Sequence, residues 1–273
     1  MIQSVNLTND IFWLGILDPH LDVFDIIMET KYGTTYNSYL VQTTEGAILV
    51  ETVKEKFFDA YLQKIEEKIG DLNQIKYIIT NHTEPDHAGS IGKLINRIPH
   101  LTVIGSKTAI TYLKDILNID FNYQTTEELK SFKLGNKTFE FIKAPFLHWP
   151  DSIYTYMPDE HVLFTCDSFG SHYSPKSGIK LSEVPQSEEA AYQDALLYYY
   201  TAIFSPFKPY VLKAIDKIKD LKLSMVCTGH GPVLDTRIDE IISTYQQWST
   251  PATKKEVKKV VIPYVSAYGY TGE

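Results

Sequence analysis

The sequence predicts an α+β sandwich with its helices on the outside. Strand-like runs occur in both halves of the chain, and helix-like segments accompany the strands in each half. The chain has 273 residues, of which 44% are hydrophobic, so it can bury a substantial core. We expect one large domain over residues 1–250, a polar linker over 251–259, and a further strand and loop over 260–273.

The first half alternates strands with helices. Short β-rich runs predict strands at residues 37–41, 47–50, 77–80 and 101–106. Helical spacing of apolar residues predicts helices at 55–69, 90–98 and 108–117. Residues 43–46 read as a hairpin turn, and Ser90 or a neighbouring acid should cap the second helix. The segment NHTEPDHAGS, residues 81–90, is expected to be a loop.

The second half begins with strands and ends with helices. We expect strands at residues 139–142, 153–157, 162–166 and 225–227. Residues 187–220 should be helical with a break at Ser205–Pro209, and residues 237–248 should form the last helix. Beyond the linker, residues 260–265 read as one more strand.

Composition excludes several classes of protein. The net charge is −8, so no basic surface for nucleic acid is expected. No signal peptide is visible, and no apolar run reaches the roughly 20 residues of a membrane span. The two cysteines are too few for a disulfide framework. We therefore expect a cytoplasmic protein that binds neither nucleic acid nor membrane.

The NHTEPDHAGS segment carries the densest chemistry in the chain. His82, Glu84, Asp86 and His87 fall within six residues. Three further candidate ligands, each after a strand-like run, are His148, Asp167 and His230. Because strand ends in layered folds converge at one edge, these loops can meet there and form a metal site. A plain polar loop with helix-capping residues would explain Asp86 but not the three distant positions.

These segments resemble the metallo-β-lactamase superfamily, and within it the flavodiiron proteins or A-type flavoproteins. The matching stretches are NHTEPDHAGS, PFLHWPDSIYTY, LFTCDSFGSH, LLYYYTAIFSPF and GHGP. The tail SAYGYTGE is similar to the first phosphate loop of a flavodoxin, which follows the β-lactamase-like domain in that family. The resemblance implies an αββα sandwich with metals at one edge of its sheets.

The resemblance also implies a set of ligands. His82, Glu84 and His148 would bind one iron, Asp86 and His230 the other, and Asp167 would bridge both. His87 is expected near the metals without binding them. Tyr199 is a candidate proton or hydrogen-bond donor to substrate, and His172 is a candidate supporting residue. The FMN phosphate loop would be formed by Ser266, Tyr268, Gly269 and Thr271.

Glu84 favours iron over zinc. Hydrolytic members of the superfamily have a histidine at this place and mostly bind zinc. A third carboxylate beside Asp86 and Asp167 gives a mixed oxygen and nitrogen site that suits non-heme iron. Zinc or manganese can still replace iron in recombinant protein. The family implies reduction of O2 to water, or of NO to N2O.

O2 reduction needs four electrons, and two ferrous ions supply only two. The family implies FMN as the donor, brought to the metals of a second subunit in a head-to-tail homodimer. Because the chain ends at Glu273, we expect it to hold no FMN and to receive electrons from a partner such as rubredoxin or a flavoprotein reductase. Two alternatives stay open, a non-enzymatic di-iron protein that binds or senses O2, and a zinc hydrolase of the superfamily.

Overall fold

The computed structural model describes residues 3–25 and 28–251, which form two large sheets and two small ones. The first sheet has the strand order β1 (Val5–Asn6), β2 (Ile11–Trp13), β7 (Tyr39–Thr43), β8 (Gly46–Val50), β9 (Ile75–Ile79), β10 (Thr102–Gly105), β11 (Asn122–Thr125). The second has the order β12 (Ser131–Leu134), β13 (Lys137–Lys143), β14 (Ile153–Met157), β15 (Val162–Cys166), β16 (Met225–Thr228). The small sheets pair β3 (Ile16–Asp18) with β6 (Thr34–Tyr36), and β4 (Val23–Phe24) with β5 (Met28–Glu29).

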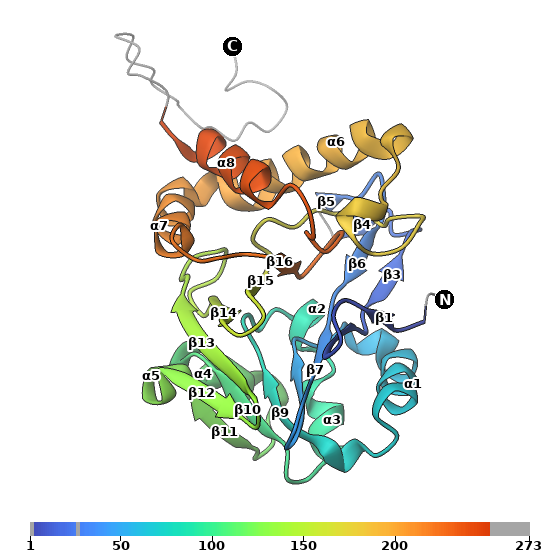
Figure 1. The fold of residues 1–273 in the computed structure, drawn as a ribbon, viewed down its shortest axis with the longest axis vertical. Coiled ribbons are helices and arrows are strands. Elements are labelled where there is room, and N and C mark those ends of the chain that lie inside the picture. The colour runs from blue at the N-terminus through green and yellow to red at the C-terminus, as the bar shows by residue number, and fades with distance from the viewer. Residues whose placement is uncertain (1–2, 26–27, 252–273) are drawn as a thin grey trace, which may run out of the picture.

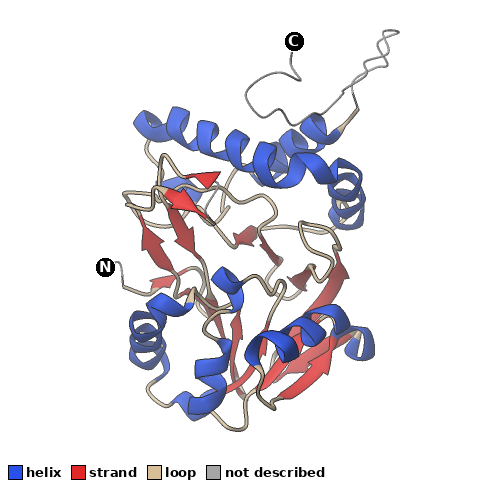
Figure 2. Cartoon of the chain, turned by 180° about the vertical axis from the view of Figure 1, so that it is seen from behind, coloured by secondary structure: helices blue, strands red, loops and turns tan. Residues whose placement is uncertain are grey.

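The helices gather in two groups on opposite sides of the sheets (Figures 1 and 2). They are α1 (Phe58–Ile69), α2 (Pro85–Ala88), α3 (Ile91–Arg97), α4 (Lys107–Leu117), α5 (Thr126–Leu129), α6 (Glu189–Tyr199), α7 (Lys208–Ile218) and α8 (Ile238–Ser249). Short turns of 3-10 helix lie at Glu55–Phe57, Leu72–Gln74, Leu181–Glu183, Gln186–Glu188 and Ser205–Phe207, and a π-helical turn at Tyr200–Phe204.

Three separate hydrophobic clusters show that these elements form four layers. One cluster joins α1, α3 and α4 to the first sheet, and another joins α6, α7 and α8 to the second. The third lies between the two sheets. Side chains of a strand alternate between faces, so in β8 Leu49 packs under the helices while Ile48 and Val50 face the other sheet. The αββα sandwich is therefore confirmed.

Most expected elements are present with small shifts at their ends. The hairpin of β7 and β8 turns tightly because Gly46 adopts a φ of +131°, which glycine tolerates best. The expected helix at 187–220 divides into α6, the π-helical turn and α7, since Pro206 and Pro209 have no backbone N–H to continue a helix.

Three sequence-based expectations about the chain need correction or lie outside the structure. The NHTEPDHAGS segment is not wholly a loop, because α2 begins at Pro85. Ser90 precedes α3, but its hydroxyl donates to the Val53 carbonyl and does not cap the helix. The linker, apart from its first residue, and the strand expected at 260–265 lie outside the described residues.

The ends of four strands meet at one edge of the sandwich. The loops that follow β9, β13, β15 and β16 carry the histidines and carboxylates singled out in the sequence. Strand β9 belongs to the seven-stranded sheet, and the other three belong to the five-stranded sheet. Segments far apart in the chain therefore share this edge.

Candidate metal centre

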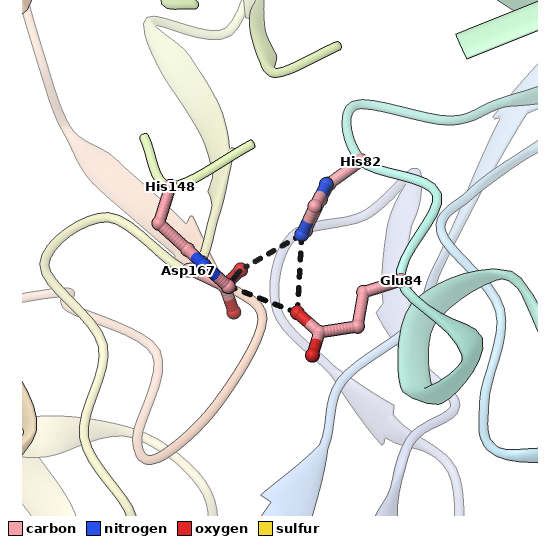
Figure 3. Close-up of side chains that lie close together, drawn as sticks. All are labelled: His82, Glu84, His148 and Asp167. Carbon is pink, nitrogen blue, oxygen red and sulfur yellow. Dashed lines mark hydrogen bonds and ion pairs between the residues drawn. The ribbon is translucent and has the colours of Figure 1, made fainter. Parts of the chain in front are cut away.

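Glu84 is free to face a metal because it does not cap the helix that it precedes. Pro85 is the first residue of α2, a position where its missing N–H costs nothing. Glu84 lies at the N-cap with an extended ψ of 141°, yet its side chain makes no capping hydrogen bond. Its carboxylate turns instead toward His82 and His148 (Figure 3). The local turn therefore presents a carboxylate where a capping residue usually stands.

One group of donor atoms comprises His82, Glu84, His148 and Asp167. Oε2 of Glu84 lies 3.2 Å from His82 Nε2 and 2.9 Å from His148 Nε2. Oδ2 of Asp167 lies 3.6 Å from each of those two nitrogens. One ligand atom from each residue therefore fits within 4.8 Å of all the others, the spacing of donors around a single ion (Figure 3).

A second group comprises Asp86, His87 and His230. Oδ2 of Asp86 lies 2.9 Å from His230 Nε2 and 3.3 Å from His87 Nε2. The other oxygen of Asp167, Oδ1, faces this group at 2.9 Å from His87 Nε2 and 3.5 Å from His230 Nε2. Asp167 thus turns one carboxylate oxygen toward each group, which is the arrangement of a bridging ligand.

His87 lies near the centre, as expected, and its position makes it a candidate ligand as well. The sequence suggested a residue near the metals that does not bind them. In the structure its Nε2 lies among the donor atoms of the second group. The ring fits there because residue 229 is glycine, where a Cβ would come within 2.7 Å of His87 Cε1. His87 is therefore positioned as a candidate ligand.

The donor set fits cations. Both oxygens of buried Asp86 and Oδ2 of Asp167 accept no hydrogen bond from the described residues. Buried carboxylate oxygens without partners are costly unless a positive charge meets them. Three carboxylates and four imidazoles converge here, and this mixture of oxygen and nitrogen donors suits non-heme iron.

The pKa shifts of the histidines show the same demand for positive charge. Burial lowers the pKa of His82, but hydrogen bonds to Asp151 and Glu84 outweigh it and raise the pKa well above its ordinary value. Burial also opposes protonation of His87, yet Asp86 and Asp167 raise its pKa to about 10. The cluster therefore favours positive charge, and metal binding there should release protons.

Residues behind the ligands hold the rings in place, and the sequence analysis missed them. Asp151 lies 3.1 Å from His82 Nδ1 and also accepts hydrogen bonds from Thr83. The Thr35 carbonyl accepts from His230 Nδ1 at 2.5 Å. Each bond leaves the Nε2 lone pair facing the centre. Asp151 stands three residues after His148, and this closeness to a ligand candidate was the one sign in the sequence that Asp151 belongs to the centre.

Tyr199 and His172 both lie at the centre, as their candidate roles require. The Tyr199 hydroxyl donates to Asp167 Oδ1 at 3.0 Å, and burial raises the pKa of Tyr199 well above its ordinary value. The His172 ring lies 4.9 Å from the His230 ring and 4.8 Å from that of Tyr199. The FMN-loop candidates Ser266, Tyr268, Gly269 and Thr271 lie outside the described residues.

The first group of ligand candidates reaches solvent at Glu84 and His148. The side chains of His148 and Glu84 are 20% and 12% exposed. The side chains of the other five ligand candidates are at most 2% exposed. The Trp149 ring stands edge-on to His82 with centroids 5.0 Å apart and forms a wall beside this opening. No helix in the described part of the chain has the length and apolar character to cross a bilayer.

Comparisons with known proteins place the chain in one family. Residues 34–231 match the model of the "ODP family beta lactamase". The flavo-diiron protein FprA2 of Clostridium acetobutylicum is 39% identical over 99% of this chain and 67% of its own length. The type A flavoprotein fprA of Rhodobacter capsulatus is 34% identical over 96% of this chain and 60% of its own length.

Solved structures agree. The flavodiiron protein from Giardia intestinalis superposes with a TM-score of 0.84 at 26% identity, covering 91% of this chain and 60% of that protein. Rubredoxin oxygen:oxidoreductase from Desulfovibrio gigas gives 0.84 at 26% identity, covering 90% and 61%. The chain thus spans about two thirds or less of these relatives. It belongs to the flavodiiron proteins, and its described residues form their metallo-β-lactamase-like domain.

Proposed function

We propose that the centre binds two iron ions and reduces O2 to water, NO to N2O, or both. The observation that supports this most directly is Asp167, whose two oxygens face two separate donor groups. His82, Glu84 and His148 would hold one iron on one side of that carboxylate. Asp86, His87 and His230 would hold the other.

Two irons held in this way would supply electrons and open coordination positions to a diatomic substrate. The protein contributes the setting for that chemistry. Glu84 and His148 line the open side by which substrate enters, and Trp149 shields it. The Tyr199 hydroxyl keeps its proton well into the alkaline range because burial raises its pKa, so it remains a hydrogen-bond donor beside Asp167.

Electrons must reach the irons from outside the described residues. We infer a donor such as FMN on a flavodoxin-like domain, rubredoxin or a flavoprotein reductase, and a head-to-tail homodimer that brings donor and irons together. One relative of known structure is named a rubredoxin oxygen:oxidoreductase, which supports a donor of this kind. Both cysteines are unpaired and buried, which favours a cytoplasmic location.

Anaerobic loading with ferrous iron tests the proposal. We expect about two irons per chain, as in other two-metal sites. Stopped-flow mixing with O2 should then oxidise both irons rapidly and irreversibly, with ferric absorption bands appearing. The same protein loaded with zinc is the matched control, since zinc has no redox chemistry.

The alternatives give different results in this experiment. A stable adduct that releases O2 under vacuum would indicate an O2-binding or sensing protein. Hydrolysis of esters or lactams by the zinc-loaded chain, with no O2 consumption by the iron-loaded one, would indicate a hydrolase. Either result contradicts the proposed reductase.

A further inference from the structure

A cavity beside helix α6 reaches His172, whose ring contacts the His230 ring of the metal centre. Its volume is about 140 Å³, and it lies between the segment 29–32 and helix α6. Its lining residues are Glu29, Thr30, Lys31, Tyr32, His172, Asp194, Ala195 and Tyr198. A water molecule takes about 30 Å³ in the liquid, so the cavity can hold a few small molecules.

The inner end of this cavity is a buried imidazole with one free nitrogen. His172 is 3% exposed, and its Nε2 has no hydrogen-bond partner among the described residues. Its other nitrogen, Nδ1, lies 2.9 Å from the Thr34 hydroxyl. A buried polar atom without a partner costs about 1–3 kcal/mol. A hydrogen-bonding occupant of the cavity would remove that cost.

The hydrogen bonds behind His172 decide which atom carries its proton. The Thr35 carbonyl can only accept, so His230 Nδ1, 2.5 Å away, carries a proton. The Thr34 hydroxyl also lies 3.3 Å from His230 Nδ1 and can accept from it. The hydroxyl proton then has two acceptors within reach, the Thr35 carbonyl at 3.3 Å and His172 Nδ1 at 2.9 Å, and the shorter contact is the one to His172. A neutral His172 therefore has its proton on Nε2 and donates into the cavity.

The charges at the mouth select a neutral occupant. Glu29 and Asp194 carry negative charge there, and Lys31, the one cation among the described lining residues, is already paired with Asp194 at 3.1 Å. The Tyr32 hydroxyl also donates to Asp194. An anion would meet a net negative mouth, whereas a neutral oxygen acceptor meets no such barrier.

We propose that this cavity is a water site in which His172 Nε2–H donates to water, connecting the surface beside α6 with the His230 side of the centre. The site would give the centre a second contact with solvent, separate from the opening at Glu84 and His148. This inference rests on the proposed function only in taking His230 as a metal ligand. Water is both the solvent and the product expected of O2 reduction.

Proton exchange at His172 in the zinc-loaded protein tests the inference. The Nε2–H signal is identified in nitrogen-15 NMR spectra by its loss in His172→Gln, and its exchange with water is measured by saturation transfer. Ala195→Leu adds bulk to the cavity wall and should slow that exchange at least tenfold. Ala190→Leu, the same change at an exposed position of α6, should leave it unchanged.

Several outcomes would overturn the inference. One is unchanged exchange in Ala195→Leu that still binds zinc at wild-type stoichiometry. Another is iodide bound at His172 Nε2 in crystals soaked in sodium iodide, because it would show an anion site. If Ala195→Leu does not fold, Tyr198→Trp serves as the blocking variant in its place, because Tyr198 lines the mouth of the cavity and is 43% exposed. The zinc protein has no redox activity, so failure here leaves the reductase proposal standing, and the reverse also holds.

Discussion

Asp167 is the residue on which both metal groups depend. Its Oδ2 faces His82 and His148, and its Oδ1 faces His87 and His230. Tyr199 donates a hydrogen bond to the same carboxylate. A substitution here therefore affects both groups at once.

Asp167→Asn should lose most of the bound metal, because a neutral amide is a poor bridging ligand. We expect iron content to fall from about two ions per chain to less than one, as judged against other two-metal sites. Elemental analysis of purified protein measures this. Asp220→Asn, at an exposed turn, should keep the wild-type content. Two retained metals in Asp167→Asn would show that the bridge is assigned to the wrong residue.

Asp151 acts on the metal through His82. Because its carboxylate holds His82 Nδ1, Asp151→Asn should weaken metal binding about 10- to 100-fold without removing a ligand. Competition titration of cobalt against a chromophoric chelator measures the affinity. Asp115→Asn on the exposed side of α4 serves as control. Equal affinities in the two variants would contradict the role given to Asp151.

At the scale of elements, the turn after β16 decides whether the second group can form. Gly229 lies against His87, and a Cβ there would come within 2.7 Å of the ring. Gly229→Ala should therefore displace His87 and lower metal content toward one ion per chain, roughly half of a two-metal site. Gly92→Ala, inside α3 and near only the end of the Leu117 side chain, should keep both metals. Elemental analysis and the cobalt spectrum distinguish these outcomes.

The sequence predicted the elements that have a repeated pattern or dense chemistry. Helices α1, α4 and α8 were expected because apolar residues recur at helical spacing. The six expected ligands lie together because each follows the end of a strand at one edge of the sheets. The assignment of these residues as ligands stays a prediction that metal analysis of the variants tests.

The short strands and the contacts between distant segments could not be predicted from the sequence. The strands β1 to β6 have only two or three residues each, too few for a period to show. Thr34 and Thr35 become partners of His172 and His230 only through contacts about 140 to 200 residues away along the chain. The direction of the His87 ring depends on α2, a single turn inside an expected loop.

At the scale of the whole molecule, one buried lysine ties α1 to the first strands. Lys64 is 6% exposed, donates to the Gly15 carbonyl at 2.6 Å and lies over the Trp13 ring. Burial lowers the pKa of Lys64 to about 8. In the unfolded chain the same group keeps its proton until about pH 10.5.

Stability should therefore rise with pH between about 8 and 10.5, because the unfolded state binds more protons in that range. The free energy of unfolding of wild type should gain up to about 3 kcal/mol relative to Lys64→Met over this range. Urea unfolding at several pH values measures the difference. Lys133→Met, at an exposed strand position, should follow the wild type. A parallel pH profile for Lys64→Met would contradict the buried-lysine argument.

The two halves of the molecule each supply part of the metal centre. His82, Glu84, Asp86 and His87 follow the first sheet, whereas His148, Asp167 and His230 follow the second. A bound ion therefore adds a crosslink between two halves that also meet through apolar packing and hydrogen bonds. A ligand whose free concentration is 100 times its dissociation constant raises the free energy of unfolding by about 2.7 kcal/mol. In an iron-starved cell, the protein would consequently open more often and be degraded faster, so that its abundance would follow the iron supply.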